Sequence, residues 1–303
     1  MITRRDFVQT MGAVASLGML SRSAGAQPAV ITRTIPATGE ALPAIGMGSS
    51  RTFDVSLDDG SRERLGEVLK LFFEGGGTLI DSSPMYGNAE SVLGQLLRDT
   101  PGRERLFSAT KVWTDGTSAG VDQMQRSMQR MGVERFDLMQ IHNLRSWTDH
   151  LPTLRKWKAS EKLRYVGITT SHGRAHEDLY RILETEDFDF VQLSYSIGNR
   201  NVERRLLPLA RDRGIGVIVN RPFQRGSLFR KVKGVDLPAW AAEYDISSWG
   251  QFFLKYAISH PAVTCAIPAT AKPHHMRDNM GAGLGALPDG ATRKRMETFF
   301  DDL

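Results

Sequence analysis

The most constraining feature of the sequence is a regular alternation between short apolar runs and longer segments of helical periodicity. The runs are almost continuously apolar, which is typical of parallel strands covered on both faces. Eight such alternations predict one α/β domain, a (β/α)8 TIM barrel. The predicted strands are residues 44–47, 78–81, 106–111, 137–142, 165–169, 190–195, 216–220 and 263–268.

The segments between the runs have the spacing of helices packed by one face. In the first of them, apolar residues recur at positions 65, 68, 69 and 72, after Ser61 as a cap and before the glycines at 75–77. No G-x-G-x-x-G motif follows the first predicted strand, which disfavours a doubly wound dinucleotide-binding sheet. Ahead of the barrel, residues 31–35 and 41–45 flank a short turn and predict an N-terminal β-hairpin.

Composition narrows the class of protein. With 303 residues and 41% hydrophobic side chains, the chain has room for a large buried core. The single cysteine, Cys265, excludes an internal disulfide framework and a cysteine-based metal cluster. The formal charge of +5 includes no basic run, so we expect no nucleic acid partner.

Residues 1–26 read as an export signal. Arg4 and Arg5 precede a short apolar run at residues 11–20, and small residues at 24–26 resemble a cleavage site. The pattern resembles a twin-arginine (Tat-type) signal, whose route carries folded proteins. The run is about half of the roughly 20 residues that span a membrane, so no stable membrane anchor is expected after cleavage. The expected mature domain is 27–303, periplasmic, with the Tat export machinery as a transient partner.

Ionisable residues end three consecutive predicted strands. Asp81 closes the second, Lys111 the third and His142 the fourth, and Tyr86 follows five residues after Asp81. The carboxyl ends of barrel strands form the catalytic face, so these side chains are expected to meet. An ammonium group near the phenol of Tyr86 would lower its pKa and make it a general acid. This set protonates an oxygen but supplies no hydride, so it calls for a nicotinamide cofactor.

These segments resemble the aldo-keto reductases. The likeness is carried by the stretches 79–90, 109–113 and 138–143, and it runs from about residue 30 to about residue 300. The resemblance implies reduction of aldehyde or ketone carbonyls to alcohols, with Tyr86 as the general acid. Lys111 and Asp81 would tune the acid, and His142 would orient the carbonyl.

The resemblance also implies cofactor-binding residues. Thr169, Thr170 and Gln192 correspond to the positions that hold the nicotinamide amide, and Asn220 stands where relatives often have a stacking aromatic. The positions of the pyrophosphate loop are Arg221, Phe223, Arg225, Gly226 and Leu228. Those of the adenosine end are Ala269, Thr270, Lys272, His275 and Asn279.

Several alternatives remain open at this stage. The usual cofactor preference of the family favours NADP over NAD. Relatives often have lysine where Ala269 stands and arginine where His275 stands, and those side chains would neutralise the 2′-phosphate of NADP. A nicotinamide-binding barrel with a regulatory role and little turnover is the alternative function. A metal-dependent hydrolase using Asp81, His142 and His172 is disfavoured because Lys111 would repel a cation, so no metal is expected. Trp113 and Trp147 follow the third and fourth predicted strands and are expected to line the substrate pocket.

Overall fold

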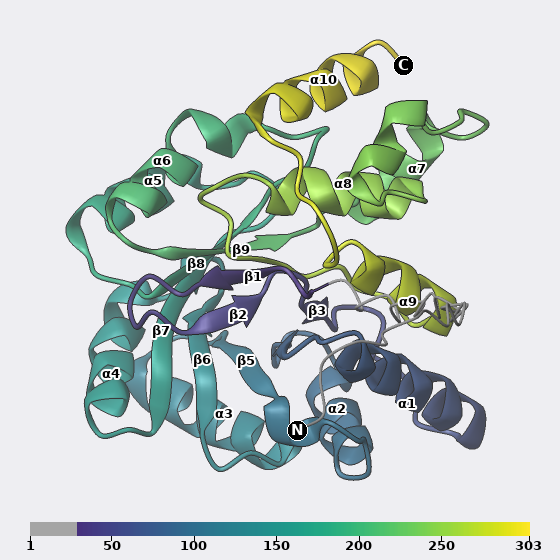
Figure 1. Ribbon diagram of the computed structural model, residues 1–303. Coiled ribbons are helices and arrows are strands. Elements are labelled where there is room, and N and C mark those ends of the chain that lie inside the picture. Colours follow the sequence, from purple (N-terminus) through teal and green to yellow (C-terminus); the bar gives the residue numbers. More distant parts are fainter. Residues whose placement is uncertain (1–28) are drawn as a thin grey trace, which may run out of the picture.

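The computed structural model describes residues 29–303 and shows eight parallel strands with helices around them (Figure 1). The strands are hydrogen-bonded in the order of the chain, from β3 to β10. Isolated parallel bridges join Ile45 to Ala266 and Gly48 to Ala269 at the two ends of this order. The predicted (β/α)8 barrel is therefore confirmed. The expected export signal, residues 1–26, lies outside the described residues.

The barrel strands lie close to their predicted positions and are shortest at the seam. Their bounds are β3 (Met47–Gly48), β4 (Leu79–Asp81), β5 (Phe107–Val112), β6 (Phe136–Ile141), β7 (Leu163–Thr169), β8 (Phe190–Ser194), β9 (Gly216–Asn220) and β10 (Cys265–Ala266). The α-helices are α1 (Asp59–Glu74), α2 (Ala89–Leu97), α3 (Thr117–Met131), α4 (Trp147–Ala159), α5 (His176–Thr185), α6 (Leu206–Asp212), α7 (Ser227–Lys231), α8 (Trp249–Ile258), α9 (Pro273–Gly281) and α10 (Gly290–Asp301). None of the helices between residues 29 and 303 is both long and apolar enough to cross a bilayer.

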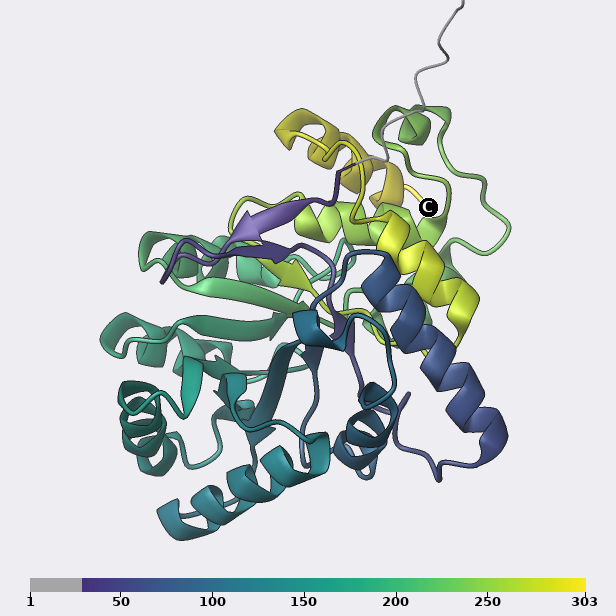
Figure 2. The same cartoon turned by 60° about the horizontal axis from the view of Figure 1, so that its bottom comes forward.

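Helix α1 shows how local sequence sets an element of the outer ring. Its expected apolar face is buried against the barrel. The N-cap is Asp58 rather than Ser61, because the Asp58 carboxylate accepts a hydrogen bond of 2.7 Å from the backbone N–H of Ser61. Helix α9, which follows the last barrel strand, packs beside α1, which follows the first, so these two helices cover the seam (Figures 1 and 2).

The hairpin of β1 (Thr32–Thr34) and β2 (Ala41–Pro43) is confirmed, and it closes one end of the barrel. Ile35 and Leu42 pack into the same cluster as the barrel-interior side chains, Tyr165 among them. The Tyr165 hydroxyl donates to Glu40 and accepts from the Thr38 hydroxyl, each at 2.7 Å. With this end covered, a ligand reaches the interior from the opposite face, where the strands end.

Gly94 offers a test of the ring packing between α2 and α3. A Cβ at Gly94 would lie 1.9 Å from the carbonyl oxygen of Arg130. We expect Gly94→Ala to lower the free energy of unfolding in urea by about 1–3 kcal/mol, the usual cost of overpacking. Gly66→Ala in α1 is the control, because its added Cβ meets nothing within 4 Å and its helix propensity improves. Equal stability of the two variants would contradict the packing.

Candidate active site

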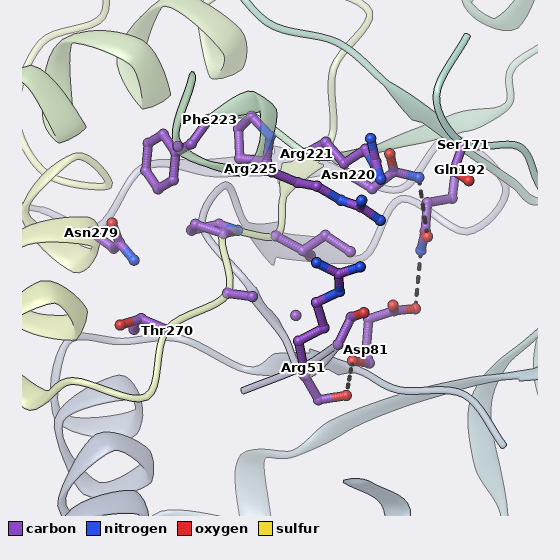
Figure 3. Close-up of a pocket in the computed structure, with 18 of the residues that line it drawn as sticks. Arg51, Asp81, Ser171, Gln192, Asn220, Arg221, Phe223, Arg225, Thr270 and Asn279 are labelled. Atoms are coloured by element: carbon purple, nitrogen blue, oxygen red, sulfur yellow. Dashed lines mark hydrogen bonds between the residues drawn. The ribbon is translucent and has the colours of Figure 1, made fainter. Parts of the chain in front are cut away.

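A cavity of about 580 Å³ opens at the carboxyl ends of the strands, a size that suits a small ligand or cofactor (Figure 3). Its wall is built from loops that follow β3, β4, β6, β7 and β9, together with the segment between β10 and α9. Asp81, Tyr86 and His142 line it, and Lys111 lies buried behind them. The four residues predicted from strand ends are therefore brought together.

A buried ion pair lies at the base of the cavity. The Lys111 Nζ is 2.5 Å from Asp81 Oδ2 and donates to the Ser82 carbonyl oxygen at 2.7 Å. The side-chain amides of Gln140 and Gln192 donate to Asp81 Oδ1 at 2.9 and 3.0 Å. Burial, the largest single effect, lowers the pKa of Lys111, but the charge of Asp81, the phenol of Tyr86 and the hydrogen bonds to both together raise it above its usual value. Lys111 is therefore a fixed cation at neutral pH.

Sequence reasoning did not single out Gln140 as a site residue. Its signal was nevertheless present, because Gln140 precedes His142 by two residues and strand side chains alternate between faces. Leu138 on the same strand packs in the barrel interior, which places Gln140 on the inward side as well. The inward positions of β6 thus lead from the apolar interior to the polar base of the cavity.

Tyr86 is half-buried, with the Lys111 Nζ 4.9 Å from its ring centroid. The expected lowering of its pKa is wrong in sign. Burial raises the pKa of Tyr86, and the nearby Lys111 charge offsets only part of that rise. The order of the strand ends indicated the nearby lysine, but the degree of burial is a property of the folded chain. The phenol is consequently protonated throughout the neutral range, so its hydroxyl is available to donate a hydrogen bond or a proton.

His142 is held as a neutral ring beside Tyr86. Burial, followed by the charge of Lys111, lowers the pKa of His142 to about 3. Its Nδ1 lies 3.0 Å from the Ser83 Oγ, which also accepts a hydrogen bond from the Met85 N–H at 3.2 Å. We infer from this network that the Ser83 hydroxyl donates to Nδ1. The ring proton is then on Nε2, where it serves as a hydrogen-bond donor.

Most of the predicted cofactor residues line the cavity, and three do not. Those on the wall are Thr169, Gln192, Asn220, Arg221, Phe223, Arg225, Gly226, Ala269, Thr270, His275 and Asn279. Thr170 directly follows Thr169, so the two side chains face opposite sides, and Thr170 is buried off the wall. Leu228 is buried in α7. Lys272 lies at the N-cap of α9, away from the lining.

The side chains near the expected nicotinamide position are already hydrogen-bonded to one another. The Asn220 Oδ1 accepts from the Ser194 hydroxyl at 2.6 Å, and its Nδ2 donates to the Thr170 carbonyl oxygen at 3.0 Å. The Thr169 Oγ1 accepts from the Asn143 N–H at 3.1 Å. These bonds fix the end of the cavity nearest Asp81, as the bonded chain from Asp81 through Gln192 to Asn220 shows in Figure 3.

The apolar wall differs from the expected one. Neither Trp113 nor Trp147 lines the cavity; Met85, Phe229 and Trp249 do. Trp113 packs instead against the Arg145 guanidinium, whose carbon lies 5.0 Å from the ring centroid. Trp249 begins α8, more than a hundred residues after the expected tryptophans, so only the folded chain shows that it lines the wall.

The polar and basic side chains that line the cavity are suited to binding a dinucleotide cofactor. At the α9 end of the cavity, Asn279 is only 4% exposed, and its Nδ2 has no hydrogen-bond partner within residues 29–303. A buried amide donor without a partner indicates a ligand that completes its bonding. Arg221 and Arg225 line the wall between Asn279 and the Asp81 end, where they suit an anionic group (Figure 3). Metal chemistry is not indicated, because Asp81 is paired with Lys111.

Comparison with known proteins agrees with this geometry. The model of the aldo/keto reductase family matches residues 44–292. The chain belongs to the aldo/keto reductase family. A methylglyoxal reductase of Escherichia coli is 28% identical to it over 246 residues, 78% of this chain and 84% of the relative. A glyoxal reductase of Bacillus subtilis is 25% identical over 219 residues, 70% of this chain and 75% of the relative.

Solved structures of the family share the fold. An aldo/keto reductase of Klebsiella pneumoniae in complex with NADP and acetate has a TM-score of 0.72 at 24% identity, covering 86% of this chain and 93% of its own. A second Klebsiella pneumoniae structure, in complex with NADPH, has a TM-score of 0.74 at 23% identity, covering 90% and 95%. At this identity the likeness concerns the barrel fold alone.

The tautomer of His142 is open to measurement by nitrogen-15 NMR of the imidazole ring. Because its pKa lies near 3 instead of the ordinary 6.5, we expect the ring to stay neutral at pH 5, with the proton on Nε2. Ser83→Ala removes the hydroxyl that faces Nδ1, so the spectrum should show a mixture of the two tautomers. Ser83→Thr, which keeps a hydroxyl, is the control. A ring that titrates near pH 6.5 would contradict the assignment.

Proposed function

We propose that this aldo/keto reductase reduces an aldehyde or ketone to the alcohol, with NADPH as the hydride donor and Tyr86 as the general acid. The observation that carries the proposal is the cluster of Tyr86, His142 and the buried Asp81–Lys111 pair at the base of the cavity. The methylglyoxal and glyoxal reductases among the relatives support a carbonyl substrate.

The side chains of the site have complementary tasks in this reaction. Bound NADPH supplies the hydride that the carbonyl carbon receives. The Nε2–H of neutral His142 and the hydroxyl of Tyr86 both donate to the carbonyl oxygen, which polarises it and orients its carbon. As negative charge develops on that oxygen, Tyr86 transfers its proton to it. The phenolate left behind is stabilised by the Lys111 cation and takes a new proton from solvent.

The high pKa of Tyr86 in the ligand-free site is compatible with this task. An acid that stays protonated is available in every molecule at neutral pH, and the alkoxide that forms from the carbonyl is a stronger base than phenolate. Lys111 keeps the reverse direction accessible, because its charge lowers the free energy of the phenolate. Asp81 holds Lys111 in position for this purpose.

Chain groups along the cavity would hold the cofactor. We expect Gln192 and Asn220 to hold the nicotinamide, and Thr270, His275 and Asn279, which line the same cavity, to hold the adenosine end. The preference for NADPH over NADH is supported by the NADP and NADPH complexes of the two solved relatives. In the chain itself, His275 and the Thr270 hydroxyl are the polar groups available to a 2′-phosphate.

Tyr86→Phe tests the general acid. We expect kcat for methylglyoxal reduction, followed by the loss of NADPH absorbance, to fall by at least about a hundredfold, the usual scale of general acid catalysis. Tyr180→Phe, on α5 and outside the cavity lining, is the matched control and should keep the wild-type rate. The wild type should also show a higher kcat/KM with NADPH than with NADH.

Two outcomes of this experiment would contradict the proposal. A Tyr86→Phe variant as fast as the wild type would mean that another group supplies the proton. A wild-type protein that binds NADPH but turns over no aldehyde, ketone or quinone would instead support the regulatory alternative.

We also propose that the protein is exported in folded form through its twin-arginine segment, with the mature chain beginning near Gln27. Changing Arg4 and Arg5 to lysine keeps the charge but removes both guanidinium groups, which ammonium groups do not replace. We expect the precursor to accumulate inside the cell, as measured by fractionation and immunoblotting. A double-lysine form found in the periplasm at the normal level would indicate a general secretory signal.

A further inference from the structure

Four arginines surround the open end of the cavity without carboxylate partners. Arg51 follows β3, Arg174 follows β7, and Arg221 and Arg225 follow β9. Within residues 29–303 none of the four forms an ion pair, whereas many surface arginines of the same region do. Like charges gathered without a counter-charge repel one another, so this arrangement favours a bound anion.

The two carboxylates on the cavity wall do not neutralise these arginines. Asp81 is paired with Lys111 and also accepts two amide hydrogen bonds. Asp278 accepts from the Ser248 hydroxyl at 2.8 Å and from the Gln251 side-chain amide at 3.0 Å. The positive charge of the arginines is therefore left for a ligand.

Arg51 and Arg221 extend into the cavity between Asp81 and Asn220 (Figure 3). Arg221 donates a hydrogen bond to the Nε2 of His172, whose Nδ1 lies 2.8 Å from the Ser171 hydroxyl. This contact fixes the direction of the Arg221 side chain. Burial, then the charges of Arg225 and Arg51, lower the pKa of Arg221 to about 10, so the positive charges of the three arginines on the cavity wall repel one another.

The backbone supports the same arrangement. Arg51, His172 and Arg221 have φ values of 65°, 65° and 55°, in the left-handed region that non-glycine residues rarely adopt. Such conformations cost free energy, persist only where the surroundings impose them, and cluster at ligand sites. Here the three left-handed residues lie in three different loops. Together these loops bring the guanidinium groups of Arg51 and Arg221, and the His172 ring that contacts Arg221, to the same part of the cavity.

The location of Arg51 and Arg221 within the cavity indicates which ligand they bind. Arg51 and Arg221 extend toward the Asp81 end of the cavity (Figure 3), where the charge of Arg221 also favours the ionised form of the Tyr86 phenol. The backbone at Gly48, three residues before Arg51, pairs with Asp81 in the sheet. An anion held by Arg51 and Arg221 thus lies near the reacting carbonyl and far from Asn279 at the other end.

We propose that Arg51 and Arg221 form a clamp for a carboxylate of the substrate, so that the substrates are oxo acids: aldehydes or ketones that carry a carboxylate. The inference rests on the proposed carbonyl reduction and specifies its substrate class. Guanidinium groups bind carboxylate and phosphate oxygens through paired hydrogen bonds. The diphosphate of the cofactor has the same oxyanion chemistry, and the experiment separates the two sources.

The first arm compares acids with their neutral esters. The pairs are 4-carboxybenzaldehyde with methyl 4-formylbenzoate, and succinic semialdehyde with its methyl ester. We expect the wild type to prefer each acid, and we expect Arg51→Gln to lower the acid-to-ester ratio of kcat/KM at least tenfold, mainly through KM of the acid. A charge-assisted hydrogen bond is strong enough to produce a change of this size.

Arg174→Gln is the matched control. It removes the same charge near the mouth of the cavity, but Arg174 is not on the wall. Its effect should be below about threefold and should disappear at high salt, because it acts only through a screened field. An equal loss in Arg174→Gln and Arg51→Gln would overturn the clamp in favour of general electrostatic attraction.

The second arm measures binding without turnover. NADPH affinity is followed by quenching of tryptophan fluorescence, since Trp249 lines the cavity. Calorimetry then measures 4-(hydroxymethyl)benzoate on the NADP-loaded protein. We expect Arg51→Gln to weaken the benzoate at least tenfold. Weaker NADPH binding with an unchanged acid-to-ester ratio would assign Arg51 to the cofactor diphosphate and overturn the proposal.

The two arms also separate this proposal from the proposed function. If the wild type reduces neither acid nor ester, carbonyl reduction of these compounds fails, and loss of benzoate binding in Arg51→Gln still supports the clamp. If the wild type reduces both equally and binds no benzoate, carbonyl reduction stands and the clamp is overturned.

Discussion

The site depends on one buried ion pair, between Asp81 and Lys111, at the base of the cavity. Removing one partner of such a pair leaves a charge without compensation and is strongly destabilising. Here the remaining hydrogen-bonding capacity is used by Gln140, Gln192 and the Ser82 carbonyl, so the pair is fully supported. The pair therefore keeps the Lys111 ammonium charged and at a fixed point inside the barrel.

That fixed charge and the burial around it set the protonation of the two side chains above. His142 is neutral because both burial and Lys111 disfavour its cation, while Tyr86 is neutral because burial outweighs the lysine. Two neutral donors can then face one carbonyl oxygen without the repulsion that a charged imidazole would add beside Lys111. The arginines at the cavity mouth extend the positive potential outward, which favours anionic ligands throughout the cavity.

Much of the fold was accessible from the sequence because the signals are local. Apolar runs identified all eight barrel strands, although β3 and β10 are only two residues long, and turn chemistry identified the hairpin. The order of the predicted strands also placed Asp81, Lys111 and His142 together at the carboxyl ends of the barrel strands. The failures lie where local rules are insufficient: Asp58 rather than Ser61 caps α1, and Thr170 faces away from the cavity that Thr169 lines.

The sequence by itself therefore determined the barrel, its hairpin and the identity of the polar residues at the strand ends, because periodicity and chain order decide these. Only the tertiary structure decided the sign of the Tyr86 pKa shift, the sharing of Asp81 between Gln140 and Gln192, and the placement of Arg51 and Arg221 on one cavity wall. The physical reason is that burial and electrostatic distance are set across the closed barrel, between residues that are far apart along the chain.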